Sequence, residues 1–203
     1  MTTYSRSERI ALCDLLDEVG PDALTRCEDW TAADLATHLF IREQRPLSAL
    51  GIFVPPLHAA ASRASAQALQ RYSYAGVVDR VRQGPPAWSP YRYLDETMNH
   101  VEYFVHHEDV RRAQPQWAPR VLAAGEEDAL WGRLLGAVRL RVAKVPVGVV
   151  LRRAGTSDEV GGPAGAVLQG LPSELVLYAL GRADVARLEP LSGPDRPPPP
   201  ARD

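Results

Sequence analysis

Prolines divide this chain of 203 residues into segments whose apolar residues recur with helical spacing. A proline interrupts a helix and disfavours helical backbone at the residue before it, so each proline marks a boundary. The segment 5–19 has apolar residues at every third or fourth position and ends before Pro21. A second helix is expected from Thr31 to about Arg45, and Thr31 with Asp34 is close to a capping box. The first part of the chain is therefore predicted to be helical.

The following segments keep the helical pattern as far as Pro146. We expect two shorter helices, a long helix and one further helix, at 62–72, 76–83, 95–113 and 126–143. The last two have acidic residues in the first turn and basic residues in the last turn, an arrangement that complements the helix dipole.

Beyond Pro146 the period changes to that of a strand. Val147, Val149 and Leu151 alternate with their neighbours in a β-rich run that Gly155 ends. Two weaker strand candidates and an intervening helix follow, at 166–169, 186–191 and 172–181. We therefore expect a mainly α fold, with a helical domain at 1–125, a small α+β domain at 126–192 and a disordered proline-rich tail at 193–203.

Charge and hydropathy exclude several classes of protein. The formal net charge is -2, which argues against nucleic-acid binding through a general positive field. No stretch approaches the roughly 18 apolar residues of a membrane span, and the polar residues 1–9 predict no signal peptide. Cys13 and Cys27 form no C-x-x-C motif and are expected to be inert buried thiols in a reducing cytoplasm. The basic run 133–153 is interpreted as solvated surface rather than as a steering patch for an anion.

The segment 99–109 combines histidines and carboxylates within a predicted helix. Glu102 and His106 are four residues apart, so they stack on one helix face, which also carries Val101 and Val105. A carboxylate is costly to bury without a partner, and a divalent ion between Glu102 and His106 would satisfy both side chains.

His38 is the best candidate for a third ligand, because it shares a helical stripe with Leu35 and lies beside Leu39. The set of His38, Glu102 and His106 suits zinc with one open position, or another borderline divalent ion. Two alternatives stay open at this point. An arginine pairs with Glu102 in one, and His38 is a hydrogen-bonded core residue in the other.

The other titratable residues near this set have lesser expected roles. His100 and His107 are seven residues apart, too far to share one ion, and are expected to be more exposed or to support the ligands. Asp109 lies one turn beyond His106 and could orient its second ring nitrogen. His58 lies in an expected loop and has no partner at a recognisable spacing.

Three segments of the sequence resemble one known family. Residues 27–39 (CEDWTAADLATHL) and 102–109 (EYFVHHED) resemble the two metal-binding motifs of the mycothiol-dependent maleylpyruvate isomerase-like proteins, actinobacterial members of the DinB-like superfamily. Residues 171–182 (LPSELVLYALGR) resemble the C-terminal domain of the same proteins. The segment 46–94 gives no match at the level of residues, so the resemblance carries over no substrate-binding residue.

The resemblance implies a fold, a metal site and a reaction. The fold is a DinB-like four-helix bundle with a small C-terminal α+β domain. His38, Glu102 and His106 would ligate a divalent metal ion, usually zinc, and mycothiol would be the thiol that attacks a small electrophilic substrate. The outcome would be isomerisation or thiol transfer. A non-catalytic metal-binding or stress-related protein and a metal-dependent hydrolase are the alternatives.

Overall fold

The computed structural model describes residues 3–27, 29–44, 58–89, 92, 99–140, 143, 145–162 and 165–192. The chain divides into two compact units, Met1–Ala118 and Pro119–Asp203. The expected boundary was at residue 125. That residue lies in the first turn of a helix of the second unit, and the two units meet in sequence between Ala118 and Pro119. The expected tail at 193–203 lies outside the described residues.

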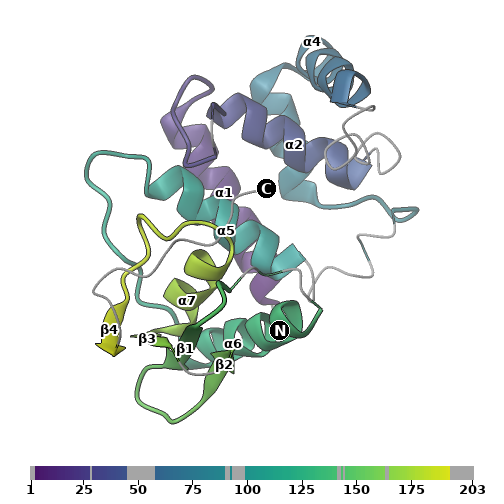
Figure 1. The fold of residues 1–203 in the computed structure, drawn as a ribbon. Coiled ribbons are helices and arrows are strands. Elements are labelled where there is room, and N and C mark those ends of the chain that lie inside the picture. Colours follow the sequence, from purple (N-terminus) through teal and green to yellow (C-terminus); the bar gives the residue numbers. More distant parts are fainter. Residues whose placement is uncertain are drawn as a thin grey trace. The chain divides into compact units, whose positions relative to one another are not determined.

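The first unit is built from helices α1 (Tyr4–Val19), α2 (Ala32–Gln44), α4 (His58–Gln83) and α5 (His100–Arg111). Helix α1 packs against α5 and α4, and α2 packs against α4 (Figure 1). Fully buried leucines of α1 and α2 meet small and branched residues of α4 in one core, which includes Leu12, Leu16, Leu35, Leu39, Ala68, Val77 and Val81. The helical spacing in the sequence therefore marks the faces that meet in this core.

Polar caps fix where the first two helices begin. The hydroxyl of Thr3 accepts a hydrogen bond from the backbone N–H of Arg6 at the start of α1. At the start of α2, the carboxylate of Asp34 accepts from the backbone N–H of Thr31 at 2.9 Å, and the Thr31 hydroxyl accepts from the N–H of Asp34 at 3.3 Å. These reciprocal bonds satisfy donors that a helix leaves free, so the expected capping pair is confirmed.

Helix α4 contains the break that the sequence predicted between 62–72 and 76–83. Ser73 has φ 59° and ψ 171°, a conformation outside any helix, and it separates two helical halves. The Ser73 hydroxyl accepts a hydrogen bond from the N–H of Gly76 and so caps the second half.

Helix α5 ends at Arg111, two residues before the expected end at 113. Its expected start at 95 lies outside the described residues. The backbone N–H of Arg112 donates to the carbonyl of Glu108, which closes the last turn.

The second unit contains helices α6 (Ala124–Arg139) and α7 (Pro172–Ala179), which pack against each other, and strands β1 (Val149–Arg153), β2 (Glu159–Gly161), β3 (Ala166–Gly170) and β4 (Glu189–Ser192). The strand order is β2-β1-β3-β4. Strands β1 and β3 are parallel, and the two outer pairs are antiparallel. The expected strands at 166–169 and 186–191 and the helix at 172–181 correspond to β3, β4 and α7.

Three details of the second unit differ from expectation. Helix α6 ends at Arg139 rather than at 143, and Val147 precedes β1 in a turn, where it is 96% exposed. Strand β2 was not expected, because three residues are too few to establish an alternating pattern.

In the basic run, Arg152 pairs with Glu159 and Arg153 pairs with Asp128. None of the helices among the described residues is both long enough and apolar enough to cross a membrane.

Candidate metal centre

Helices α2 and α5 each contribute to one polar cluster in the first unit. The apolar stripe of α2 is fully buried at Leu35 and Leu39, and this burial carries the neighbouring His38 inward. The indole of Trp30 packs on the His38 ring, with 5.0 Å between the ring centroids. The His38 side chain is consequently only 9% exposed.

The structure brings together the three residues singled out from the sequence. Nε2 of His38 lies 3.1 Å from Oε1 of Glu102, and Nε2 of His106 lies 3.4 Å from the same oxygen. One donor atom from each of the three residues lies within 4.8 Å of the other two. Glu102 is the most accessible of the set, with 27% of its side chain exposed, against 12% for His106.

The donor spacing fits a tetrahedral ion. Two ligand atoms that each lie about 2.0–2.1 Å from a zinc ion are about 3.3 Å apart. The two distances to Glu102, 3.1 and 3.4 Å, bracket this value. Two imidazoles and one carboxylate are also a donor set that zinc takes when one coordination position stays open. The residues present therefore fit a divalent ion in both chemistry and spacing.

An arginine pairs with the same carboxylate, as the competing interpretation of the sequence required. Nε of Arg42 lies 3.5 Å from Oε1 of Glu102, and Nη1 of Arg42 donates to Oδ1 of Asn99 at 2.6 Å. Both arginine and asparagine are buried. The ion pair and the histidine contacts coexist. Arg42, His38 and His106 all contact Oε1 of Glu102 and form one network around it.

The surroundings set the charge of each group when no ion is bound. Burial alone would raise the pKa of Glu102, but Arg42 and the two histidines hold that pKa well below its usual value. Burial alone would lower the pKa of His106, but its hydrogen bonds with Asp109, Cys27 and Glu102 hold that pKa well above its usual value. Burial lowers the pKa of His38, and its hydrogen bond with Glu102 opposes that shift only in part.

These shifts favour the ionised form of Glu102, the protonated form of His106 and the neutral form of His38. An ion that binds Nε2 of both rings must therefore displace the proton of His106.

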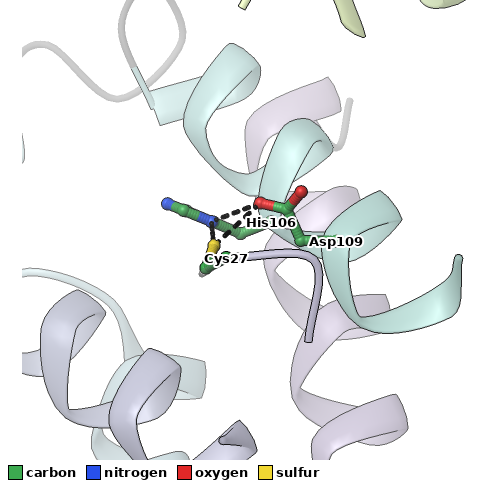
Figure 2. A group of neighbouring side chains, drawn as sticks. All are labelled: Cys27, His106 and Asp109. Atoms are coloured by element: carbon green, nitrogen blue, oxygen red, sulfur yellow. Dashed lines mark hydrogen bonds and ion pairs between the residues drawn. The ribbon is translucent and has the colours of Figure 1, made fainter. Parts of the chain in front are cut away.

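The second nitrogen of His106 faces two further side chains. Nδ1 lies 3.0 Å from Oδ2 of Asp109 and 3.7 Å from Sγ of Cys27, and Figure 2 shows the three side chains converging. Asp109 therefore lies in a position to orient the His106 ring. Cys27 was expected to be buried and inert, but it is only half-buried and contacts Asp109 at 3.2 Å. Its separation of 79 positions from His106 gave no spacing signal in the sequence.

Two histidines of α5, His100 and His107, were expected to be more exposed or to support the ligands, and the first alternative is wrong because both are buried. His100 is fully buried and stacks on the ring of Tyr4, with 5.6 Å between centroids. Nδ1 of His107 lies 3.0 Å from Oε2 of Glu8, and both side chains are buried. Helix α1 covers this face of α5, which the sequence of α5 alone does not reveal. The side chain of His58 lies outside the described residues.

Comparison with known proteins gives similarity of structure only. No protein-family model and no curated protein matches the sequence. Two crystal structures do match, one described as the mycothiol-dependent maleylpyruvate isomerase and the other as a histidine-to-alanine mutant of it. The sequence identities are 16% and 17%, the TM-scores are 0.59 and 0.61, and in both cases all of each chain is covered. The chain therefore has the fold of that isomerase, which is mainly α with a small C-terminal sheet, as the sequence predicted.

Proposed function

We propose that this chain is a metal-dependent enzyme that uses a small-molecule thiol, mycothiol, in the isomerisation of a small electrophilic substrate or in thiol transfer to it. The observation that carries the proposal is the convergence of His38, Glu102 and His106 at the spacing of metal ligands. The thiol and the reaction type are suggested by the two structures of the same fold, which are described as a mycothiol-dependent isomerase. The two free thiols, Cys13 and Cys27, fit a reducing cytoplasm as its location.

In this proposal the three residues hold the ion and leave it one open position. His38, Glu102 and His106 would be the protein ligands, with zinc the preferred ion. Such an ion lowers the pKa of a bound thiol, so that a thiolate nucleophile is available near neutral pH. The accessible side of the cluster is the side of Glu102, whose side chain is the most exposed of the three. Isomerisation results if the thiol adds to the substrate and leaves again, and transfer results if it stays.

Three neighbouring residues support the ligands. Asp109 accepts a hydrogen bond from Nδ1 of His106, which leaves the lone pair on Nε2 for the ion. Arg42, itself bonded to Asn99, holds the carboxylate of Glu102 in its charged form. Nδ1 of His38 has no hydrogen-bond partner among the described residues, so the packing of Trp30 orients the His38 ring instead.

The experiment combines metal analysis with an activity assay. Purified protein should carry about one divalent ion per chain, and His38→Ala and Glu102→Gln should each lose it. Glu159→Gln is the matched control, because Glu159 pairs with Arg152 on the surface of the second unit. Full metal content in both ligand variants, when each is combined with Cys27→Ser to remove the thiol beside His106, would contradict the proposed site.

The reaction is tested with mycothiol and small electrophiles. We expect turnover that needs both the thiol and the ion and that is lost in Glu102→Gln. Metal-dependent turnover without any thiol would favour the hydrolase. Bound metal without turnover in either assay would favour a non-catalytic metal-binding protein.

A further inference from the structure

His106 has two ring nitrogens, and each of them faces a different group of donor atoms. Nε2 faces Glu102, whereas Nδ1 faces Cys27 and Asp109 (Figure 2). The second group contains a thiol, which the first group lacks. Thiolate is a soft ligand and selects thiophilic ions such as zinc or cadmium.

The distances within the second group are near those expected between three ligands of one tetrahedral ion. The Sγ atom of Cys27 lies 3.7 Å from Nδ1 of His106 and 3.2 Å from Oδ2 of Asp109, and the nitrogen and oxygen are 3.0 Å apart. Around a tetrahedral zinc ion the expected separations are about 3.5 Å to a sulfur and about 3.3 Å between nitrogen and oxygen. Shifts of a few tenths of an ångström therefore separate the observed arrangement from a bound one.

Backbone hydrogen bonds hold the Cys27 loop against α5. The N–H of Arg26 donates to the carbonyl of Asp109 at 2.9 Å, which ties the residue next to Cys27 to the residue that carries the carboxylate donor. Within the loop, the N–H of Cys27 donates to the hydroxyl of Thr25, and its carbonyl accepts from the N–H of Trp30 at 3.1 Å. The three donors are thus brought together by the fold before any ion arrives.

We propose that Cys27, His106 and Asp109 form a second metal position, specific for thiophilic divalent ions. The metal–sulfur and metal–nitrogen bonds form as the thiol proton of Cys27 and the proton on Nδ1 of His106 leave to solvent, and no oxidant is required. Because a neutral imidazole has a single lone pair, the ring of His106 serves one position at a time. The second position is independent of His38 and Glu102, and so it can exist whether or not the proposed function is correct.

The second cysteine of the chain provides the control. Cys13 is fully buried, its recorded hydrogen bond goes to the carbonyl of Val78, and burial raises its pKa to about 12. In Cys13→Ser the only thiol left is that of Cys27.

Cadmium is the probe, because a cadmium–thiolate bond has an ultraviolet charge-transfer absorption that reports a sulfur ligand. Titration of Cys13→Ser should give a saturable band, and the band should persist when Glu102→Gln is added. Adding Asp109→Asn should weaken cadmium binding about tenfold or more, because one of three donors loses its charge. No band in Cys13→Ser, or a band unaffected by Asp109→Asn, would overturn the proposal.

A protection experiment tests the same position without altering its residues. In Cys13→Ser, an uncharged alkylating reagent reacts with Cys27 alone. Free cadmium at ten times its Kd should slow alkylation about tenfold, because only unoccupied protein reacts. An unchanged alkylation rate would overturn the proposal. Loss of metal from Glu102→Gln while this protection persists would leave both proposals standing, whereas the same loss of metal without protection would retain the first position only.

Discussion

Nε2 of His38 on α2 lies 3.1 Å from Oε1 of Glu102 on α5, across 64 positions of the sequence. The same carboxylate oxygen is 3.4 Å from Nε2 of His106 and 3.5 Å from Nε of Arg42. A single side chain therefore joins two helices and neutralises the charges gathered around it. Changing it removes one contact each from His38, Arg42 and His106 at once.

The first prediction concerns stability in the presence of a metal chelator. Glu102→Gln should lower the free energy of unfolding by about 2 kcal/mol, because the cationic Arg42 and His106 stay largely buried without their counter-charge. The value is below that of a fully buried pair, because 27% of the Glu102 side chain is exposed. Urea unfolding followed by circular dichroism measures it. Glu159→Gln should change the stability by less than about 0.5 kcal/mol, and an equal effect of the two variants would contradict the network.

The second prediction concerns pH and zinc affinity. The pKa of His106 is held well above its usual value, so a proton occupies the ring at neutral pH and competes with the ion. Affinity should therefore fall as the pH is lowered, by about tenfold per unit where a single proton is displaced, and should level off above the His106 pKa. Competition titrations with a chromophoric chelator at several pH values measure this slope. The Asp109→Asn variant removes one cause of the raised pKa, so its plateau should begin at a lower pH.

The elements best predicted from the sequence are those whose signal is local. The capping pair Thr31 and Asp34 is complete within four residues, and the break at Ser73 lies between two stretches with helical spacing. Strand β2 was missed because its pairing with β1, which forms at Leu151 and Val160, stabilises a segment with no pattern of its own.

The residues around the His106 ring were predictable from the sequence apart from Cys27, since Asp109 was also expected at the second ring nitrogen. Spacing within α5 joins Glu102 to His106, and the apolar stripe of α2 points His38 inward. The Cys27 contact depends on how a loop folds back on α5, and the burial of His107 depends on α1. Such contacts between distant segments leave no periodicity in a single sequence.

The third prediction tests the kink in α4. The φ of 59° and ψ of 171° at Ser73 lie in a region that costs a side chain of the L configuration about 1–3 kcal/mol and costs glycine little. Ser73→Gly should therefore raise the free energy of unfolding by about 0.5–1 kcal/mol, after the loss of the hydrogen bond to Gly76 is included. Ser65→Gly, within the helical part of α4, should instead lower stability by about 0.5 kcal/mol. Equal effects of the same sign at the two serines would contradict a strained Ser73.

The last prediction separates the two roles that Asp109 can have at the His106 ring. In a Cys27→Ser background the thiol ligand is gone, so zinc affinity reports only the set of His38, Glu102 and His106. Asp109→Asn should then weaken zinc binding about 10–100-fold, because an amide N–H donated to Nδ1 puts the ring proton on Nε2, where the ion must bind. Asp79→Asn is the matched control, since Asp79 pairs with Arg82 on the surface and should leave the affinity unchanged. If Asp109→Asn weakened cadmium binding only while Cys27 is present, and left zinc affinity intact in its absence, Asp109 would act as a ligand of the second position and not as the residue that orients His106.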